Sequence, residues 1–267
     1  MDFSKVKLVV SDMDGTLLND HGEVSARFFN QFEQLKKHQI RFVAASGRQY
    51  QSIVEKLNTI KNDISIIAEN GGFMQHDTIS QVLLKLSDDD VRKCVNMLRR
   101  IEGCYIVLCG KESAYIESND AAFISKFSQY YKAYQIVDDL TKVKHDDFLK
   151  IAVYHFDSSE KNILPHINAL KQDLQVSVSG PNWLDISHKE ANKGYALTRL
   201  QQQLGINKEE TLVFGDYNND LQMLELAYFS YAMANAHPDV KKTARFETKS
   251  NSEEGVECVI DALLSLQ

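Results

Sequence analysis

Short apolar segments alternate with amphipathic ones through the first eighty residues. Apolar, β-branched runs that stop abruptly predict buried strands, and apolar residues at a spacing of three or four predict helices. The strands are expected over 6–10, 40–45 and 64–68, and the helices over 25–38 and 50–57. Because the connections are short, this alternation predicts parallel strands joined by right-handed crossovers.

The pattern changes at about residue 83 and returns after residue 188. In between, helices are expected over 87–100, 121–131 and 160–170, and strands over 105–109, 114–117, 148–156, 175–179 and 184–187. After residue 188, helices are expected over 195–204, 221–227 and 256–264 and strands over 211–214 and 229–233. Within residues 83–187, the paired strands with intervening helices favour an antiparallel sheet. We therefore expect residues 1–82 and 188–267 to form one doubly wound, Rossmann-like α/β domain, with an α+β domain inserted over 83–187.

Composition narrows the functional classes. The chain has 267 residues, 43% of them hydrophobic, and a net charge of −7 from 30 basic and 37 acidic side chains. An acidic protein has no general attraction for nucleic acid or anionic membranes, so a phosphate-bearing substrate needs local positive charge. The four cysteines match no zinc spacing, and neither a signal peptide nor a membrane span is recognisable. We expect a cytoplasmic protein with reduced thiols.

Four polar clusters follow predicted core strands or begin a helix. In open parallel sheets, ligands bind at the carboxyl ends of the strands. The clusters cover residues 12–16, 46–48, 192–194 and 215–220. The topology allows clusters 12–16, 46–48 and 215–220 to meet at that edge, and the lysine of cluster 192–194 can reach it from a helix.

Acidic residues dominate the first and last clusters. Asp12 and Asp14 follow a strand, and Gly15 permits a turn that brings both carboxylates to one place. Their mutual repulsion favours a cation, and magnesium prefers such oxygen ligands. Asp216 and Asp220 can complete the site. Alternatively, the first cluster is a turn with solvated acids and the last is a helix cap.

The two middle clusters carry groups that suit an anion. Ser46 and Gly47 can supply a hydroxyl and a backbone N–H. Lys193 lies near a helix start, where the positive end of the helix disfavours a cation unless the ammonium faces a phosphate. The alternatives are an ordinary strand-to-helix turn and a surface lysine.

Taken together, the clusters resemble the four motifs of the haloacid dehalogenase superfamily of phosphatases, in particular its Cof-type branch (subfamily IIB). The matching segments are Asp12-Met13-Asp14-Gly15-Thr16-Leu17, Ser46-Gly47-Arg48, Lys193-Gly194 and Gly215-Asp216-Tyr217-Asn218-Asn219-Asp220. Residues 69–72 and 233–236 also look like segments of that branch. The resemblance spans both parts of the predicted core and the position of the insertion.

The resemblance implies magnesium-dependent hydrolysis of small phosphate monoesters, such as sugar phosphates, through an aspartyl-phosphate. Asp12 is the implied nucleophile, and Asp14 the acid that protonates the leaving group and then activates water. Magnesium is implied at Asp12, the Asp14 carbonyl and Asp216, with Asp220 at the metal or orienting its water. The implied phosphate-binding residues are Met13 through its backbone, Ser46, Gly47, Lys193 and Asn219. Arg48 is expected near the substrate or in a structural salt bridge.

Residues 83–187 are expected, by the same resemblance, to form a cap that reads the leaving group. Trp183 and His188 lie near its end and either face the substrate or are a core tryptophan and a surface histidine. The alternatives for the chain are a specialised sugar-phosphate phosphatase, a phosphomannomutase-like relative or a receiver-type phosphoacceptor. Receivers are near ~120 residues and lack the insertion. The expected partner is a small phosphorylated metabolite, and the expected state a monomer.

Overall fold

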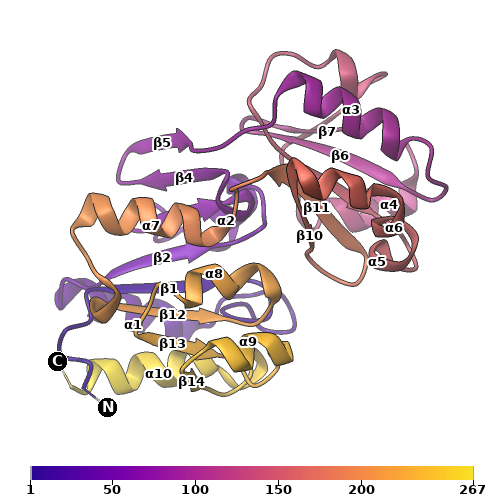
Figure 1. Cartoon of the computed structure of the whole chain (residues 1–267). Coiled ribbons are helices and arrows are strands. Elements are labelled where there is room, and N and C mark those ends of the chain that lie inside the picture. Colours follow the sequence, from indigo (N-terminus) through magenta and orange to yellow (C-terminus); the bar gives the residue numbers. More distant parts are fainter. Residues whose placement is uncertain (1, 267) are drawn as a thin grey trace.

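The computed structural model describes residues 2–266, which contain one eight-stranded and one six-stranded sheet (Figure 1). The larger sheet has the order β14-β13-β12-β1-β2-β3-β4-β5. Strands β14 to β3 are parallel, and β4 and β5 are antiparallel additions at the edge. The strands are β1 (Leu8–Asp12), β2 (Arg41–Ala45), β3 (Ser65–Ala68), β4 (Phe73–His76), β5 (Ile79–Val82), β12 (Thr211–Gly215), β13 (Phe229–Ala232) and β14 (Phe246–Glu247).

Amphipathic helices cover this sheet. They are α1 (Ala26–Lys37), α2 (Tyr50–Lys56), α7 (Lys193–Leu204), α8 (Leu221–Leu224), α9 (Pro238–Thr243) and α10 (Gly255–Leu264). The Ser25 side chain caps α1 by accepting from the Phe28 N–H, and Phe28, Phe32 and Leu35 are buried on one side of that helix. Helix α7 is capped by Asn192 and ends at Gly205, whose left-handed backbone suits a residue without a Cβ.

Strand β1 lies in the middle of the parallel part, and all five of its residues are buried. Its neighbours are β2 and β12, which come from distant parts of the chain. In the register, Asp12 is beside Ala45 and Ser11 is beside Phe214. The residues that follow β1, β2 and β12 therefore lie at the same edge of the sheet.

The smaller sheet has the order β10-β11-β9-β6-β7-β8 and is antiparallel except where β7 meets β8. Figure 1 shows it beside the larger sheet, in magenta to dark orange. Its strands are β6 (Tyr105–Gly110), β7 (Ala114–Ile116), β8 (Tyr134–Ile136), β9 (Phe148–Tyr154), β10 (Leu174–Val178) and β11 (Trp183–His188). Its helices are α3 (Asp88–Leu98), α4 (Ala121–Phe127), α5 (Ser159–Asn162) and α6 (Leu164–Ile167). Most of its buried apolar residues form two hydrophobic clusters of their own, whereas Leu149 of β9 belongs to the cluster of the larger sheet.

The predicted fold class, a parallel α/β sheet with an additional α+β part, is confirmed. The predicted continuous helix over 160–170 is wrong. The segment instead forms α5, α6 and the 3₁₀ helix Asn168–Gln172, because Pro165 has no N–H for a continuous helical ladder. The helix predicted over 121–131 ends at Phe127. No helix of residues 2–266 is long and apolar enough to cross a membrane.

Candidate active site

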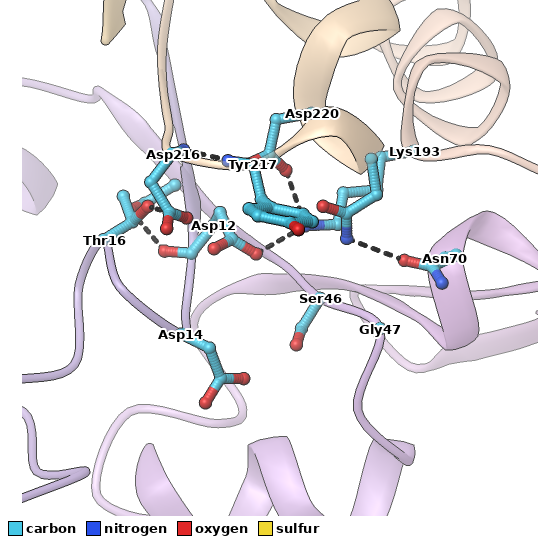
Figure 2. Close-up of polar contacts among 12 residues, drawn as sticks. Asp12, Asp14, Thr16, Ser46, Gly47, Asn70, Lys193, Asp216, Tyr217 and Asp220 are labelled. Atoms are coloured by element: carbon cyan, nitrogen blue, oxygen red, sulfur yellow. Dashed lines mark hydrogen bonds and ion pairs between the residues drawn. The ribbon is translucent and has the colours of Figure 1, made fainter. Parts of the chain in front are cut away.

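Three carboxylates meet at the carboxyl edge of the larger sheet (Figure 2). Asp12 is the last residue of β1, Asp216 follows β12, and Asp220 ends the 3₁₀ helix Asn218–Asp220. One oxygen atom of each carboxylate lies within 4.8 Å of the others. Two of the clusters that the sequence pattern singled out thus come together in one place.

Lys193 lies between two of these carboxylates. It is the first residue of α7 and is fully buried, and its ammonium pairs with Asp12 and, at 2.7 Å, with Asp220 Oδ1. The other oxygen of Asp220 accepts hydrogen bonds from the backbone N–H groups of Asp216 and Tyr217, at 2.9 and 3.1 Å. Asp220 therefore fixes both the lysine and the loop after β12.

The group is deficient in positive charge. Three carboxylates face one ammonium, so two negative charges have no partner in the group. Burial, reinforced by the charge of Asp220, raises the pKa of Asp12 well above its ordinary value and that of Asp216 to about 7. Burial alone lowers the pKa of Lys193, but the two carboxylates outweigh it and raise that pKa. A hard divalent cation suits this set of oxygen atoms in charge and in donor type.

The Asp14 side chain points away from the three carboxylates (Figure 2). Arg48 donates to both of its oxygens, with Nε 2.7 Å from Oδ2 and Nη2 2.6 Å from Oδ1. The guanidinium is buried and also donates to Ser52 Oγ and to the Gln129 carbonyl, at 3.1 and 3.0 Å. Asp14 itself is half-exposed, so it faces open space that a substrate can enter.

The expected phosphate-binding groups surround the same edge. Ser46 and Gly47 follow β2, and Ser46 Oγ accepts a hydrogen bond from the Arg48 N–H at 3.1 Å. Asn219 donates to Asn70 Oδ1 at 3.1 Å. The side chain of Met13 is buried in the core, which leaves only its backbone for a ligand.

A cavity of about 510 Å³ extends from this edge to the smaller sheet. From the larger-sheet side it is lined by Asp12, Asp14, Ser46, Gly47, Arg48, Asp216 and Asn219. The facing wall includes Tyr130, Tyr154, Lys150, Trp183 and Asp185. Trp183 thus takes the cavity-facing position, whereas His188 is not among the lining residues.

Sequence reasoning gave no role to several residues that contact the site. Thr16 donates to Asp216 at 3.1 Å, and Asn70 joins Asn219 to Asp185. Lys150 and Asp185 are buried charges within strands β9 and β11. A charged residue inside an otherwise apolar strand was a readable signal, because such a residue is rarely buried without a partner.

Comparisons with known proteins find a matching family model, similar sequences and a similar solved structure. A family model described as haloacid dehalogenase-like hydrolase matches residues 9–260. The chain is 35% identical to an Escherichia coli protein named 5-amino-6-(5-phospho-D-ribitylamino)uracil phosphatase YbjI, over 97% of this chain and 96% of that protein. It is 31% identical to the putative phosphatase YxeH of Bacillus subtilis, over 97% and 98% of the two chains. The crystal structure of SMU.1108c from Streptococcus mutans superimposes with a TM-score of 0.90 at 29% identity, covering 97% and 99%.

Proposed function

The chain belongs to the haloacid dehalogenase-like hydrolases and is a phosphatase, and on this premise we propose that it hydrolyses small phosphate monoesters with Mg²⁺ and through a phosphorylated Asp12. One observation carries the proposal. Asp12, Asp216 and Asp220 converge with Lys193 at a strand edge that opens into a cavity. Such a set can hold a cation and a phosphate next to a carboxylate nucleophile.

In the first step, an Asp12 oxygen forms a bond to phosphorus as the bond from phosphorus to the leaving oxygen breaks. Lys193, Ser46, the Gly47 N–H, the Met13 N–H and Asn219 hold the phosphate oxygens, and positioning supplies most of the catalysis in phosphoryl transfer. When bound, Mg²⁺ neutralises the charge that the phosphate and the carboxylates share. Asp12, Asp216 and the Asp14 carbonyl would hold it, and Asp220 would act through Lys193 and the loop after β12.

Asp14 handles the proton in both steps. It gives a proton to the leaving alkoxide, and it then takes one from the water that attacks phosphorus and releases Asp12. Since Arg48 engages both Asp14 oxygens, the carboxyl must exchange this pairing for a contact with the substrate. We therefore assign to Arg48 the role of holding the Asp14 carboxyl whenever that carboxyl does not contact the substrate.

We further propose that residues 83–187 act as a cap, since the cavity lies between the two sheets and the smaller sheet supplies its far wall. Aromatic rings of Tyr130, Tyr154 and Trp183 line that wall. The relatives named 5-amino-6-(5-phospho-D-ribitylamino)uracil phosphatase come from two bacteria. A phosphorylated polyol bearing a planar ring suits a cavity with a charged floor and an aromatic wall, and sugar phosphates are the second candidates.

The test is phosphate release by Asp12→Asn. The variant keeps the shape of the side chain and the contact with Lys193 but lacks the nucleophilic carboxylate. We expect no detectable magnesium-dependent turnover of p-nitrophenyl phosphate or of a panel of phosphorylated metabolites, with an unchanged circular dichroism spectrum. Turnover at the wild-type rate would remove Asp12 as the nucleophile.

A further inference from the structure

A buried group of charges that the proposed mechanism does not use connects the two sheets. Lys150 on β9 has its Nζ 3.0 Å from Glu69 Oε2 and 3.4 Å from each oxygen of Asp185 on β11. The three side chains are at most 5% exposed. Desolvation makes such a group costly, and replacing it by apolar residues is often neutral or stabilising. Its contacts therefore point to a purpose other than stability.

One line of contacts runs from Lys150 to a phosphate-binding hydroxyl. Lys150 Nζ donates to the Gly47 carbonyl at 2.7 Å. The N–H of that same peptide unit, on Arg48, donates to Ser46 Oγ at 3.1 Å. Fixing the carbonyl fixes the plane of the peptide, because the unit is rigid. Ser46 Oγ then accepts from the protein, and its own proton is left to be donated to a phosphate oxygen.

A second line runs from Asp185 to a phosphate-binding amide. Asp185 Oδ2 accepts from Asn70 Nδ2 at 2.8 Å, which fixes the orientation of that amide. Asn70 Oδ1 then accepts from Asn219 Nδ2 at 3.1 Å. The second N–H of Asn219 remains for a ligand, because an amide nitrogen carries two hydrogens.

The backbone of residues 69–71, which carries both Glu69 of the charge group and Asn70 of the second line, has an uncommon conformation. Glu69, Asn70 and Gly71 have positive φ angles of 50, 52 and 92°. Two non-glycine residues in succession in this region cost roughly 1–3 kcal/mol each and persist only where the surroundings specify them. A Cβ on Gly71 would lie 2.2 Å from the Asn192 carbonyl, so this turn is packed directly against the residue that caps α7.

We propose that Lys150 and Asp185 are positioning residues of the smaller sheet that orient Ser46 and Asn219 for the transferred phosphate. The inference rests on the proposed function for the roles of Ser46 and Asn219 and goes beyond it in one respect. Residues of the proposed cap then govern recognition of the phosphate itself, and not only of the leaving group. Because every ester carries the same phosphate group, a change at Lys150 or Asp185 must lower the activity toward all esters by the same factor.

The experiment compares Lys150→Met with Lys85→Met, a lysine whose ammonium pairs with Asp147 at the surface. Steady-state kinetics are measured for p-nitrophenyl phosphate and for glycerol phosphate, together with the inhibition constant of inorganic phosphate. We expect Lys150→Met to lower kcat/KM by about 100-fold for both esters, the loss typical of a catalytic group that is displaced by ~1 Å. The inhibition constant should rise about tenfold, or ~1.4 kcal/mol. Lys85→Met should stay within about twofold of wild type, as surface pairs contribute little.

A double-mutant cycle separates positioning from direct substrate contact, since Lys150 also lines the cavity. In a Ser46→Ala background, Lys150→Met should cost far less than in wild type, because the hydroxyl that it orients is absent. Equal costs in the two backgrounds, an unchanged inhibition constant, or losses that differ between the esters would overturn the proposal. If Lys150→Met does not fold, Lys150→Met combined with Glu69→Gln and Asp185→Asn removes all three charges of the group and is judged by the same criteria.

Failure of the proposed function gives a different result. If the wild-type protein releases phosphate from no ester, that function fails. Calorimetric binding of inorganic phosphate to wild type and to Lys150→Met still decides whether Lys150 shapes a phosphate site.

Discussion

Arg48 holds both carboxylate oxygens of Asp14 and, through another nitrogen, the carbonyl of Gln129 in the segment after α4. The Cζ atom of its guanidinium also lies over the Tyr130 ring, 4.8 Å from the ring centre. The proposed general acid is thus connected to the proposed cap by a single buried side chain. A shift of the smaller sheet relative to the cavity would move Arg48 and thereby change its hydrogen bonds to Asp14.

Arg48→Lys keeps the positive charge but cannot hold two oxygens in a planar fork. We expect kcat to fall about 10–100-fold, in the range of general acid–base contributions, with a smaller change in KM. Steady-state kinetics with p-nitrophenyl phosphate measure both constants. The control is Arg41→Lys, an exposed residue 4.0 Å from Asp77, which should leave kcat unchanged. A larger effect on KM than on kcat would assign Arg48 to substrate binding instead.

Removal of divalent cations should stop turnover, because among residues 2–266 the one ammonium of Lys193 balances only one of the three negative charges of Asp12, Asp216 and Asp220. Added Mg²⁺ should restore activity and also stabilise the fold. At a concentration of 100 times Kd, binding contributes about 2.7 kcal/mol, which raises Tm by several degrees. Differential scanning calorimetry of chelated and Mg²⁺-loaded protein measures this shift. In Asp216→Asn the shift should shrink, and a full shift there would place the metal elsewhere.

Lys193→Met should destabilise the metal-free protein by about 3–5 kcal/mol, the cost of leaving buried charges without their partner. The lysine is fully buried and contacts both Asp12 and Asp220. Urea unfolding followed by fluorescence measures the change. The matched control is Lys242→Met, whose pair with Asp239 is at the surface and should contribute less than about 1 kcal/mol. Equal effects of the two variants would contradict a buried ion pair at Lys193.

The sequence predicted the parallel sheet and the convergence of strand ends because both follow from short-range patterns. An apolar run that ends in Asp12, and another that ends before Asp216, are sufficient to place both side chains at one edge. Lys193 was also placed at a helix start, and it is the first residue of α7.

The connection between the sheets was beyond such patterns. Lys150 and Glu69 are 81 positions apart, and their contact depends on how two separately formed sheets pack. Strands β4 and β5 were not predicted, since they add to an edge where no buried alternation marks them. Pro165 was overlooked as a break, although its ring is incompatible with the interior of a helix.

Glu257→Gln should make stability depend less on pH. Burial raises the pKa of Glu257, against the hydrogen bond from Ser25 Oγ at 2.6 Å. A carboxyl whose folded pKa is raised favours the folded state at low pH and loses that contribution as pH rises above its ordinary value. The variant should therefore match wild type near pH ~4 and exceed it near pH ~8. Thermal unfolding across this range measures the difference, with the exposed Glu33→Gln as control. A variant that is less stable at the higher pH would contradict the prediction.

Trp183→Leu should change which leaving groups are accepted. The indole lines the cavity wall, where it packs on Tyr130 and Tyr154 with ring centres 5.6 and 4.9 Å away. Aromatic pairs contribute roughly 0.5–1.5 kcal/mol, so kcat/KM for p-nitrophenyl phosphate should fall about 3–10-fold and that for glycerol phosphate should hardly change. Phe156→Leu is the control, because Phe156 packs on Tyr154 but is 42% exposed and outside the cavity lining. Equal losses for both esters in Trp183→Leu would mean that the ring supports the wall of the cavity without contacting the substrate.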